Sequence, residues 1–287
     1  MTHQIITFDS LEALVGASKE PSSWGQRDSR TGDVAFTGTA SHSEACTLAT
    51  DGWAEGLRKM SLCLDAARAT STAVGQAPAY LLDVCGAYPH AAIAAAGDAF
   101  CMMAPTPVSE RARPILRLAT STALPAVYEA QEVFNYGAGL VAVIDALEAA
   151  AFSVELQTVR CNTTWGSKGE RLTITTTIKG AGEALDLERL AFCLGSASYN
   201  RRLHFGVVEA RCPAALWQGS YGTATQPEHG RDVEADVCIL PGVTMFAQGS
   251  AALASPEAAF KAMLPAITAL LTDRYSNFPP LLLGAAA

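Results

Sequence analysis

A chain of 287 residues and 30.0 kDa has room for one large domain, or for a domain with a sizeable appendage. Its hydrophobic content of 49% argues against a disordered chain, and its net charge of −8 argues against a protein that coats nucleic acid. No apolar run reaches the roughly 18 residues that span a bilayer. The N-terminal residues include acids where a secretory signal is basic, so we expect an intracellular protein.

The cysteines are expected to be reduced thiols that pack as small apolar groups. No pair forms the Cys-x-x-Cys spacing of a zinc site, a redox pair or an iron–sulfur cluster. A long chain without a secretory signal is also a poor candidate for disulfides. Most of the cysteines have apolar neighbours. The eight positions are Cys46, Cys63, Cys85, Cys101, Cys161, Cys193, Cys212 and Cys238.

The first part of the chain has the apolar spacing of helices. Residues 6–16 place Phe8, Leu11, Leu14 and Val15 on one side. Residues 43–69 suggest two helices that break at Asp51-Gly52. The polar and small residues 70–78 have the composition of a linker. We therefore predict a mainly helical N-terminal region over residues 1–77 and a second domain over residues 78–287.

The second part alternates short strands and helices. Predicted strands lie at 79–84, 114–120, 152–159, 171–179 and 235–242, and the third and fourth could form a hairpin. Predicted helices lie at 139–151, at 187–194 after the capping residue Asp186, and after Ser255-Pro256, with a kink at Pro265. This alternation predicts an α/β fold with a largely parallel sheet and helices on both faces, like a Rossmann or von Willebrand A-type domain.

Asp83 is the candidate metal ligand, because it ends a predicted strand where open α/β sheets bind ligands. A von Willebrand A-type domain begins its metal site with Asp-x-Ser-x-Ser at such a place, since Mg²⁺ prefers hard oxygen ligands. Here the run is Asp83-Val-Cys-Gly-Ala, in which both hydroxyls are lost. The alternative is a structural aspartate that hydrogen-bonds its own turn.

One further pattern bears on cofactor binding. Gly137-Ala-Gly139-Leu-Val-Ala142 matches a dinucleotide fingerprint, but it is preceded by an acidic stretch and not by a clean strand. The alternative to a dinucleotide site is that these small residues allow close packing at the start of a helix. No Gly-x-Ser-x-Gly, His-Glu-x-x-His or phosphate-binding loop occurs, so we assign no catalytic residue and no resident cofactor.

Arg201, Arg202 and His204 form the candidate binding site. Two adjacent arginines between apolar neighbours are uncommon inside a domain, and guanidinium groups bind carboxylates or phosphates in a bidentate manner. The alternative is that these arginines pair with acids of the same chain, such as Glu209.

Several blocks in this order resemble a family encoded mostly by bacteriophages and other mobile elements. Its most specific parts are Gly52-Trp53-x-x-Gly56 and Arg201-Arg202-Leu203-x-Phe205, with Asp83-Val84-x-Gly86 between them. The resemblance covers about residues 6–245, and the sequence departs from it at Cys85 and Gly195. The family carries a "domain of unknown function" label, so the resemblance implies a genomic setting but no activity.

Together these observations favour a non-catalytic binding or assembly protein of bacteriophage origin. We expect it to contact a protein partner or to self-assemble, in the host cytoplasm or in the virion. The alternative is a Mg²⁺-dependent enzyme with its site near Asp83 at the carboxyl edge of the sheet.

Overall fold

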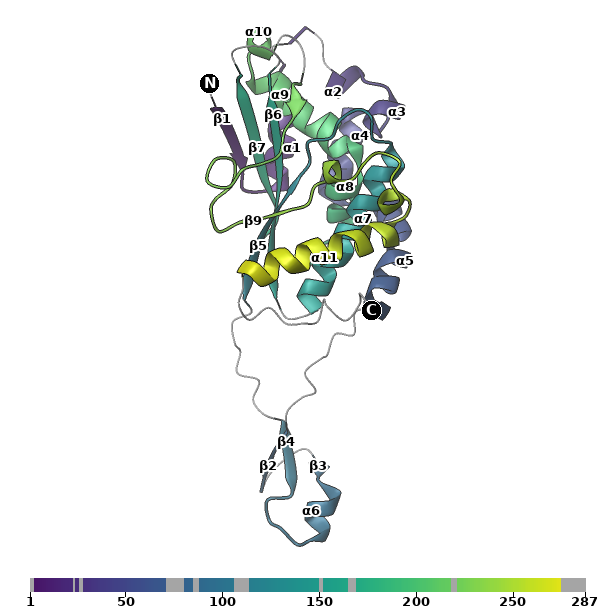
Figure 1. Cartoon of the computed structure of the whole chain (residues 1–287), viewed down its shortest axis with the longest axis vertical. Coiled ribbons are helices and arrows are strands. Elements are labelled where there is room, and N and C mark those ends of the chain that lie inside the picture. The colour runs from purple at the N-terminus through teal and green to yellow at the C-terminus, as the bar shows by residue number, and fades with distance from the viewer. Residues whose placement is uncertain are drawn as a thin grey trace.

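The computed structural model places a mostly parallel β-sheet beside a layer of helices (Figure 1). It describes residues 3–22, 24–25, 28–70, 80–84, 88–105, 114–149, 152–164, 169–217 and 221–274. The strand order of the sheet is β1-β7-β6-β5-β9, and β8 pairs with β6. The strands are β1 (His3–Phe8), β5 (Ile115–Ser121), β6 (Ser153–Thr163), β7 (Arg171–Lys179), β8 (Thr223–Ala224) and β9 (Cys238–Leu240).

Parallel pairing joins β1 to β7, β5 to β6 and β5 to β9, whereas β6 pairs antiparallel with β7 and β8. The predicted hairpin of β6 and β7 is thus confirmed, with Thr163 opposite Arg171. Between the parallel neighbours β5 and β6 the chain runs through α7 (Ala130–Ala149), which is the crossover that parallel strands need.

The predicted strand at 79–84 forms as β2 (Tyr80–Asp83), but it lies outside the central sheet. It pairs antiparallel with β4 (Met102–Pro105), which also pairs with β3 (Tyr88–Pro89). The short helix α6 (Ala91–Ala95) follows β3. The prediction that this strand belongs to the central sheet is therefore wrong: residues 80–105 build a small sheet of their own.

The N-terminal region contributes an edge strand as well as helices. Residues 3–8 form β1 in the central sheet, and the predicted helix begins only at Leu11, where the Ser10 hydroxyl accepts a hydrogen bond from the Ala13 amide. The helices that follow are α1 (Leu11–Ser18), α2 (Asp28–Thr31), α3 (Val34–Thr37), α4 (His42–Asp51) and α5 (Ala54–Thr70). The predicted break at Asp51-Gly52 is confirmed, and the predicted boundary near residue 77 lies outside the described residues.

The capping residues read from the sequence begin helices in the second part of the chain. Asp186 accepts from the Arg189 amide at the start of α8 (Leu187–Gly195), and Ser255 accepts from the Ala258 amide at the start of α11 (Pro256–Arg274). The remaining helical elements are the π-helix η1 (Tyr199–His204), α9 (Phe205–Arg211), α10 (Ala214–Trp217) and the 3₁₀ turns η2 (Val243–Met245) and η3 (Ala251–Leu253).

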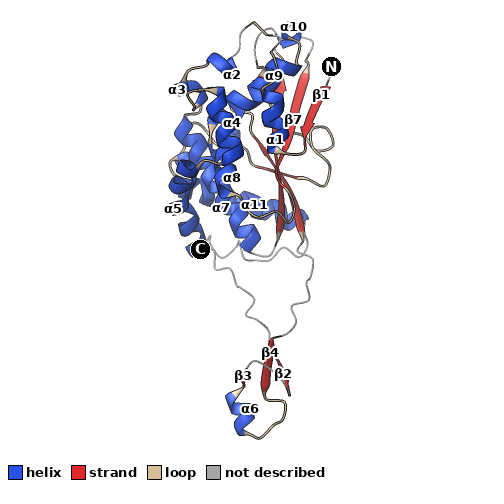
Figure 2. Ribbon diagram, turned by 180° about the vertical axis from the view of Figure 1, so that it is seen from behind, coloured by secondary structure: helices blue, strands red, loops and turns tan. Residues whose placement is uncertain are grey.

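In the described part of the chain the helices gather on one face of the sheet, as Figures 1 and 2 show from opposite sides. On β6, Val154 and Leu156 point to that face and join the main core, while Glu155 and Gln157 on the other face stay partly exposed. A second, smaller core lies on the other face, where Val233 and Val237 of the segment 225–237 pack over strand residues. The expectation of helices on both faces is therefore corrected: a loop takes the place of the second helical layer.

Segment 225–237 is fixed to the sheet by charge. Asp232 is buried and accepts hydrogen bonds from Arg171 and from the Thr173 hydroxyl, both on β7. At the far end of the segment, Arg117 on β5 donates to Glu234 at 2.6 Å and to Asp236 at 2.7 Å. These ion pairs hold an irregular segment where hydrophobic contact is limited to a few side chains.

The glycines of the dinucleotide-like pattern lie inside α7 and allow close helix packing. A Cβ atom on Gly137 would meet the Cα atom of Gly195 in α8 at 2.6 Å and would come still nearer to the Leu194 carbonyl. Similarly, a Cβ atom on Gly139 would meet the backbone nitrogen of Phe260 in α11 at 2.7 Å. These glycines therefore set the spacing between α7 and its two neighbours.

Gly137→Ala is expected to lower the free energy of unfolding by about 1–3 kcal/mol, because backbone atoms of α8 cannot move aside as a side chain can. The matched control is Gly16→Ala in α1, where a Cβ atom would meet nothing within 4 Å. That variant should gain about 0.5–1 kcal/mol from helix propensity. Urea denaturation of both variants measures the difference, and similar midpoints would contradict the packing role of Gly137.

Among the described residues, no helix combines the length and the apolar character that crossing a membrane requires.

Candidate functional sites

The predicted binding residues Arg201, Arg202 and His204 lie in the π-helix η1 and are buried. Arg201 donates to the carbonyls of Phe36 (2.6 Å) and Pro125 (3.1 Å), and its guanidinium lies 4.4 Å from the centroid of the Phe36 ring. A partner would reach this group only after residues of the α3 region had moved away.

Arg202 is more completely enclosed, with no exposed surface. Its Nη1 donates to the Ser29 carbonyl, and its Nη2 donates to the carbonyls of Gly32 and Thr39, all at 2.8–2.9 Å. Glu209, the acid named as an alternative partner, instead accepts from Ser29 and Tyr221. The partners of both arginines are thus backbone carbonyls, from residues 29–39 and, for Arg201, also from Pro125.

His204 faces the core beside Tyr199, with ring centroids 4.8 Å apart. Burial, with the Arg160 charge as a smaller cause, lowers the pKa of His204 well below its usual value, so the ring is neutral at pH 7. Its Nδ1 lies 3.4 Å from the Thr122 hydroxyl, and its Nε2 has no hydrogen-bond partner.

Asp83 is the last residue of β2, where its backbone is paired with Met102. Its side chain and residues 85–87 lie outside the described residues. Within the described ranges, no three His, Cys, Asp or Glu side chains come together in a way that could hold a metal ion. The metal site at Asp83 stays a prediction.

The described thiols are mostly buried, as at Cys161, Cys193 and Cys212. Burial raises the pKa of Cys161 to about 12 and that of Cys212 to about 11. These thiols are therefore protonated at neutral pH and poor nucleophiles.

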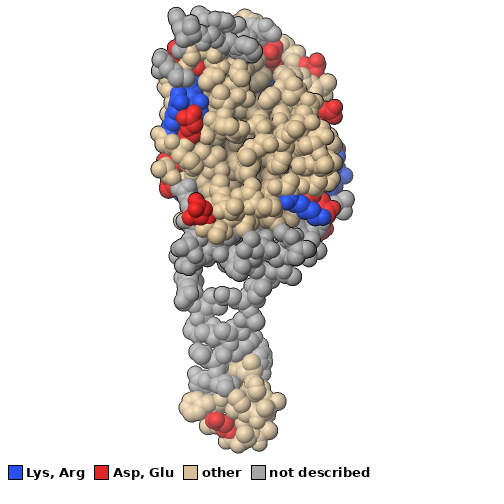
Figure 3. All heavy atoms as spheres, viewed as in Figure 1, with Lys and Arg blue, Asp and Glu red and all other residues tan. Residues whose placement is uncertain are grey.

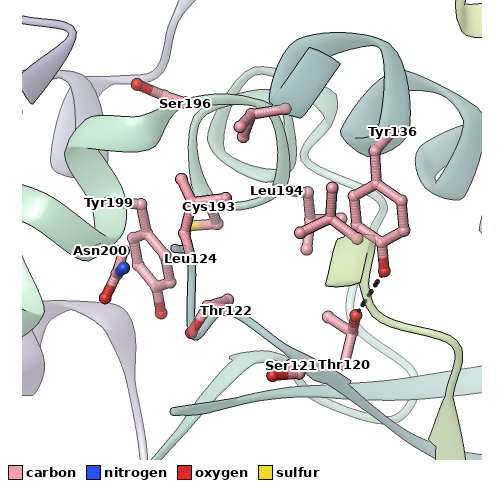
Figure 4. Close-up of a pocket in the computed structure, with 12 residues that line it drawn as sticks. Thr120, Ser121, Thr122, Leu124, Tyr136, Cys193, Leu194, Ser196, Tyr199 and Asn200 are labelled. Atoms are coloured by element: carbon pink, nitrogen blue, oxygen red, sulfur yellow. Dashed lines mark hydrogen bonds between the residues drawn. The ribbon is translucent and has the colours of Figure 1, made fainter. Parts of the chain in front are cut away.

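A cavity opens where β5 ends at the carboxyl edge of the parallel strands, the usual place for ligands in α/β proteins. Figure 4 shows the hydroxyl groups of Thr120 and Thr122 on one side of it and Tyr199 and Asn200 of η1 on the other. The Thr120 hydroxyl is bound to Tyr136 at 2.8 Å. A π-helix at such an edge is noteworthy, since these rare turns are frequent at functional sites.

A second cavity adjoins the first, and Asn200 and Leu124 line both. Its volume is about 780 Å³ including the open mouth. The polar side chains in it are Arg160 and Asn162 of β6, Asn200 of η1 and Thr223 of β8, and the aromatic ones are Phe36, Phe205 and Tyr221. Phe205 and Tyr221 stack with their ring centroids 3.6 Å apart, and Trp24 stacks on Tyr221.

Arg160 is the charged group of this second cavity. It is 1% exposed, and its Nε donates to Asn200 Oδ1 at 3.0 Å while its Nη2 donates to the Tyr221 carbonyl at 3.1 Å. Burial lowers the pKa of Arg160 to about 10, which leaves the guanidinium charged at neutral pH.

The second cavity was not predicted from the sequence, because the residues that line it are far apart in the chain. Arg160 directly follows the predicted strand 152–159, at a strand end where a charged residue is expected to face solvent. One signal was present: the hydroxyl run Thr120-Ser121-Thr122 begins at the last residue of the predicted strand 114–120, where the polar residues of a carboxyl-edge site lie.

The small sheet of residues 80–105 offers a surface of another kind. No residue of α6 is buried, and Phe100 and Val84 are 58% and 54% exposed. The stretch contains no Lys or Arg, and its acids are Asp83 and Asp98. Figure 3 shows the described part of it as an almost uncharged surface.

Comparison with known proteins places the chain in a family but assigns no activity. No curated protein and no solved structure matches the sequence. A family described as "Domain of unknown function (DUF7192)" matches residues 2–263. Because this match spans most of the 287 residues, the protein belongs to the DUF7192 family.

Proposed function

We propose that this protein is a non-catalytic binding or assembly protein of bacteriophage origin, which acts in the host cytoplasm or in the virion. The observation that carries the proposal is the outward-facing apolar surface of residues 80–105. An isolated exposed apolar residue is normal, but this small unit has two exposed apolar side chains, Val84 and Phe100, and a helix with no fully buried residue, which favours a docking element.

The partner of this surface is a second protein with an apolar patch bordered by basic side chains. The unit has acids and no bases, so charge complementarity favours Lys and Arg on the partner. The same charges disfavour a second copy of this acidic chain.

The fold relationship proposed from the sequence, to Rossmann-like or von Willebrand A-type domains, draws support from the parallel unit β5-α7-β6 and from the cavity at the carboxyl end of β5. The alternative function, a Mg²⁺-dependent enzyme near Asp83, receives no comparable support from the described residues.

Phe100→Asp is expected to abolish partner binding while the melting temperature stays within about 1 °C, because an exposed side chain contributes little to folding. The matched control is Val127→Asp on the main body, where the side chain is 57% exposed, almost the same as the 58% of Phe100. The measurement is a pull-down with each variant from lysates of infected cells. Photocrosslinking in the same lysates, from a benzophenone amino acid at position 100 or 127, then tests the surface directly.

A crosslinked product of defined mass at position 100, absent at 127 and weakened by salt, is the expected result. Equal crosslinking from both positions, or a product with twice the mass of the chain, would overturn the proposed partner surface. Mass spectrometry of purified particles then distinguishes a virion component from a cytoplasmic protein.

A further inference from the structure

Arg160 differs from the other buried arginines of the described chain in what surrounds its charge. Arg171 is neutralised by Asp232, and both terminal nitrogens of Arg201 and Arg202 donate to carbonyls. Arg160 has an unpartnered terminal nitrogen, Nη1, although the side chain is 1% exposed, whereas the unpartnered nitrogen of Arg201 and of Arg202 is Nε. An unfilled donor on a buried cation is costly, so such groups are normally paired.

No described carboxylate compensates this charge. The groups that act electrostatically on the Arg160 guanidinium are Cys212, Tyr221 and Cys161, which are all neutral at pH 7. Its hydrogen-bond acceptors, Asn200 Oδ1 and the Tyr221 carbonyl, are also uncharged. A single positive charge is therefore held at the wall of a cavity with neutral dipoles only.

Two amide side chains, Asn162 and Asn200, line the cavity with Arg160. Asn200 accepts from Arg160 through Oδ1, which turns its Nδ2 donor away from the guanidinium. Asn162, two residues after Arg160 on the same face of β6, has a buried Oδ1 without a partner. Because either end of an amide can face a ligand, Asn162 can present its NH₂ group to an anion.

The remaining wall is aromatic. Phe205 lies 5.3 Å from the Arg160 guanidinium, and Phe36 and Tyr221 line the same cavity. Phe205 and Tyr221 stack on each other, and Trp24 stacks on Tyr221. The rings stack on one another, so an apolar ligand body would contact their carbon atoms next to the charged group without lying on a free ring face.

We propose that this cavity binds a small organic monocarboxylate, with the carboxylate on Arg160 Nη1 and the amides of Asn162 and Asn200, and the apolar body on the aromatic wall. One negative charge neutralises the one buried cation, whereas a phosphate dianion would leave a net negative charge in the cavity. This site is separate from the proposed partner surface on residues 80–105, so either proposal can fail without the other.

The first test is ligand-dependent stability with sodium benzoate as the probe. Benzoate is expected to raise the melting temperature in a saturable manner, because a ligand that binds only the folded state stabilises it by mass action. Benzamide, which has the same ring without the charge, and sodium chloride at equal ionic strength should give no such rise. Isothermal titration calorimetry then measures the benzoate dissociation constant.

The second test supplies the anion from the protein itself. Asn162→Asp places a carboxylate beside Arg160, so it should raise the melting temperature without ligand and weaken benzoate binding at least tenfold. Gln157→Glu is the control, since it adds the same charge on the other face of β6. Arg160→Met removes the charge and should eliminate the response to benzoate.

Three results would overturn the proposal. Equal stabilisation by benzoate and benzamide would show that the charge is not recognised. Saturable stabilisation by chloride alone, or by phenyl phosphate in preference to benzoate, would assign a different anion. An Asn162→Asp variant that is less stable than the wild type yet binds benzoate equally well would remove Asn162 and Arg160 from the site, even if Arg160→Met does not fold.

Discussion

Asp232→Ala is expected to lower the free energy of unfolding by roughly 3–5 kcal/mol, because it leaves the buried Arg171 guanidinium without its counter-charge. Asp232 has a fully buried side chain and accepts hydrogen bonds from Arg171, from Thr173 at 2.5 Å and from the Glu228 amide at 2.8 Å. Its loss releases segment 225–237 from the outer face of the sheet. Urea denaturation followed by circular dichroism measures the effect.

The control for this prediction is Glu228→Gln. Glu228 also lies near Arg171, at 3.5 Å, but its side chain is 55% exposed. An exposed pair contributes about 0–1 kcal/mol, so this variant should be close to the wild type. Equal destabilisation by both substitutions would show that burial of Asp232 does not decide its contribution.

The pH dependence of stability is a second test of the ion pair between Asp232 and Arg171. Burial alone would raise the pKa of Asp232, but hydrogen bonds from Arg171 and Thr173 outweigh burial and lower the pKa to about 2. An aspartate in the unfolded chain has a pKa of about 3.9. The stabilisation is therefore complete above about pH 4 and is lost as the pH falls toward 2, and the Asp232→Ala variant should lack this contribution.

Arg202→Met is expected to cost on the order of 4 kcal/mol, although it keeps the apolar stem of the side chain. The guanidinium donates to the carbonyls of Ser29, Gly32 and Thr39, and the substitution leaves these buried acceptors without their donor. Because all three carbonyls belong to the α2–α3 region, hydrogen exchange should rise there first, ahead of global unfolding.

Arg211→Met is the matched control for Arg202. Its guanidinium pairs with Glu20 at the surface, and the side chain is 38% exposed. This variant should lose less than about 1 kcal/mol. If Arg202→Met were equally mild and weakened partner binding instead, the arginine would be an interface residue, as the sequence analysis expected.

Elements with a local signal were predictable from the sequence. The caps at Asp186 and Ser255, the β-branched run of residues 171–179 and the break at Asp51-Gly52 each depend on neighbouring residues only. Their physical causes are a side-chain hydrogen bond to a free amide, packing on a pleated surface and a glycine between two helices.

Features that depend on distant residues were not predictable. Residues 3–8 form a strand because β7 offers them an open edge, although the chain around them also has helical spacing. The apolar run at 79–84 looks like a central strand, but its pairing partner is the nearby β4. The pairing of Arg160 with Asn200 and Tyr221 joins three separate parts of the chain, so no window of sequence contains the cavity.

The pairing of β1 with β7 also affects how this protein is made. His3 contacts Thr173, about 170 residues later in the chain, so a ribosome adding roughly 5–20 residues per second needs about 10–30 s between the two. During that time residues 3–8 have no β7 to pair with. The nascent chain must therefore avoid pairing these residues with strands of other chains. The pairing of β1 consequently waits for the synthesis of β7, and a chaperone that shields residues 3–8 would act on them during that interval.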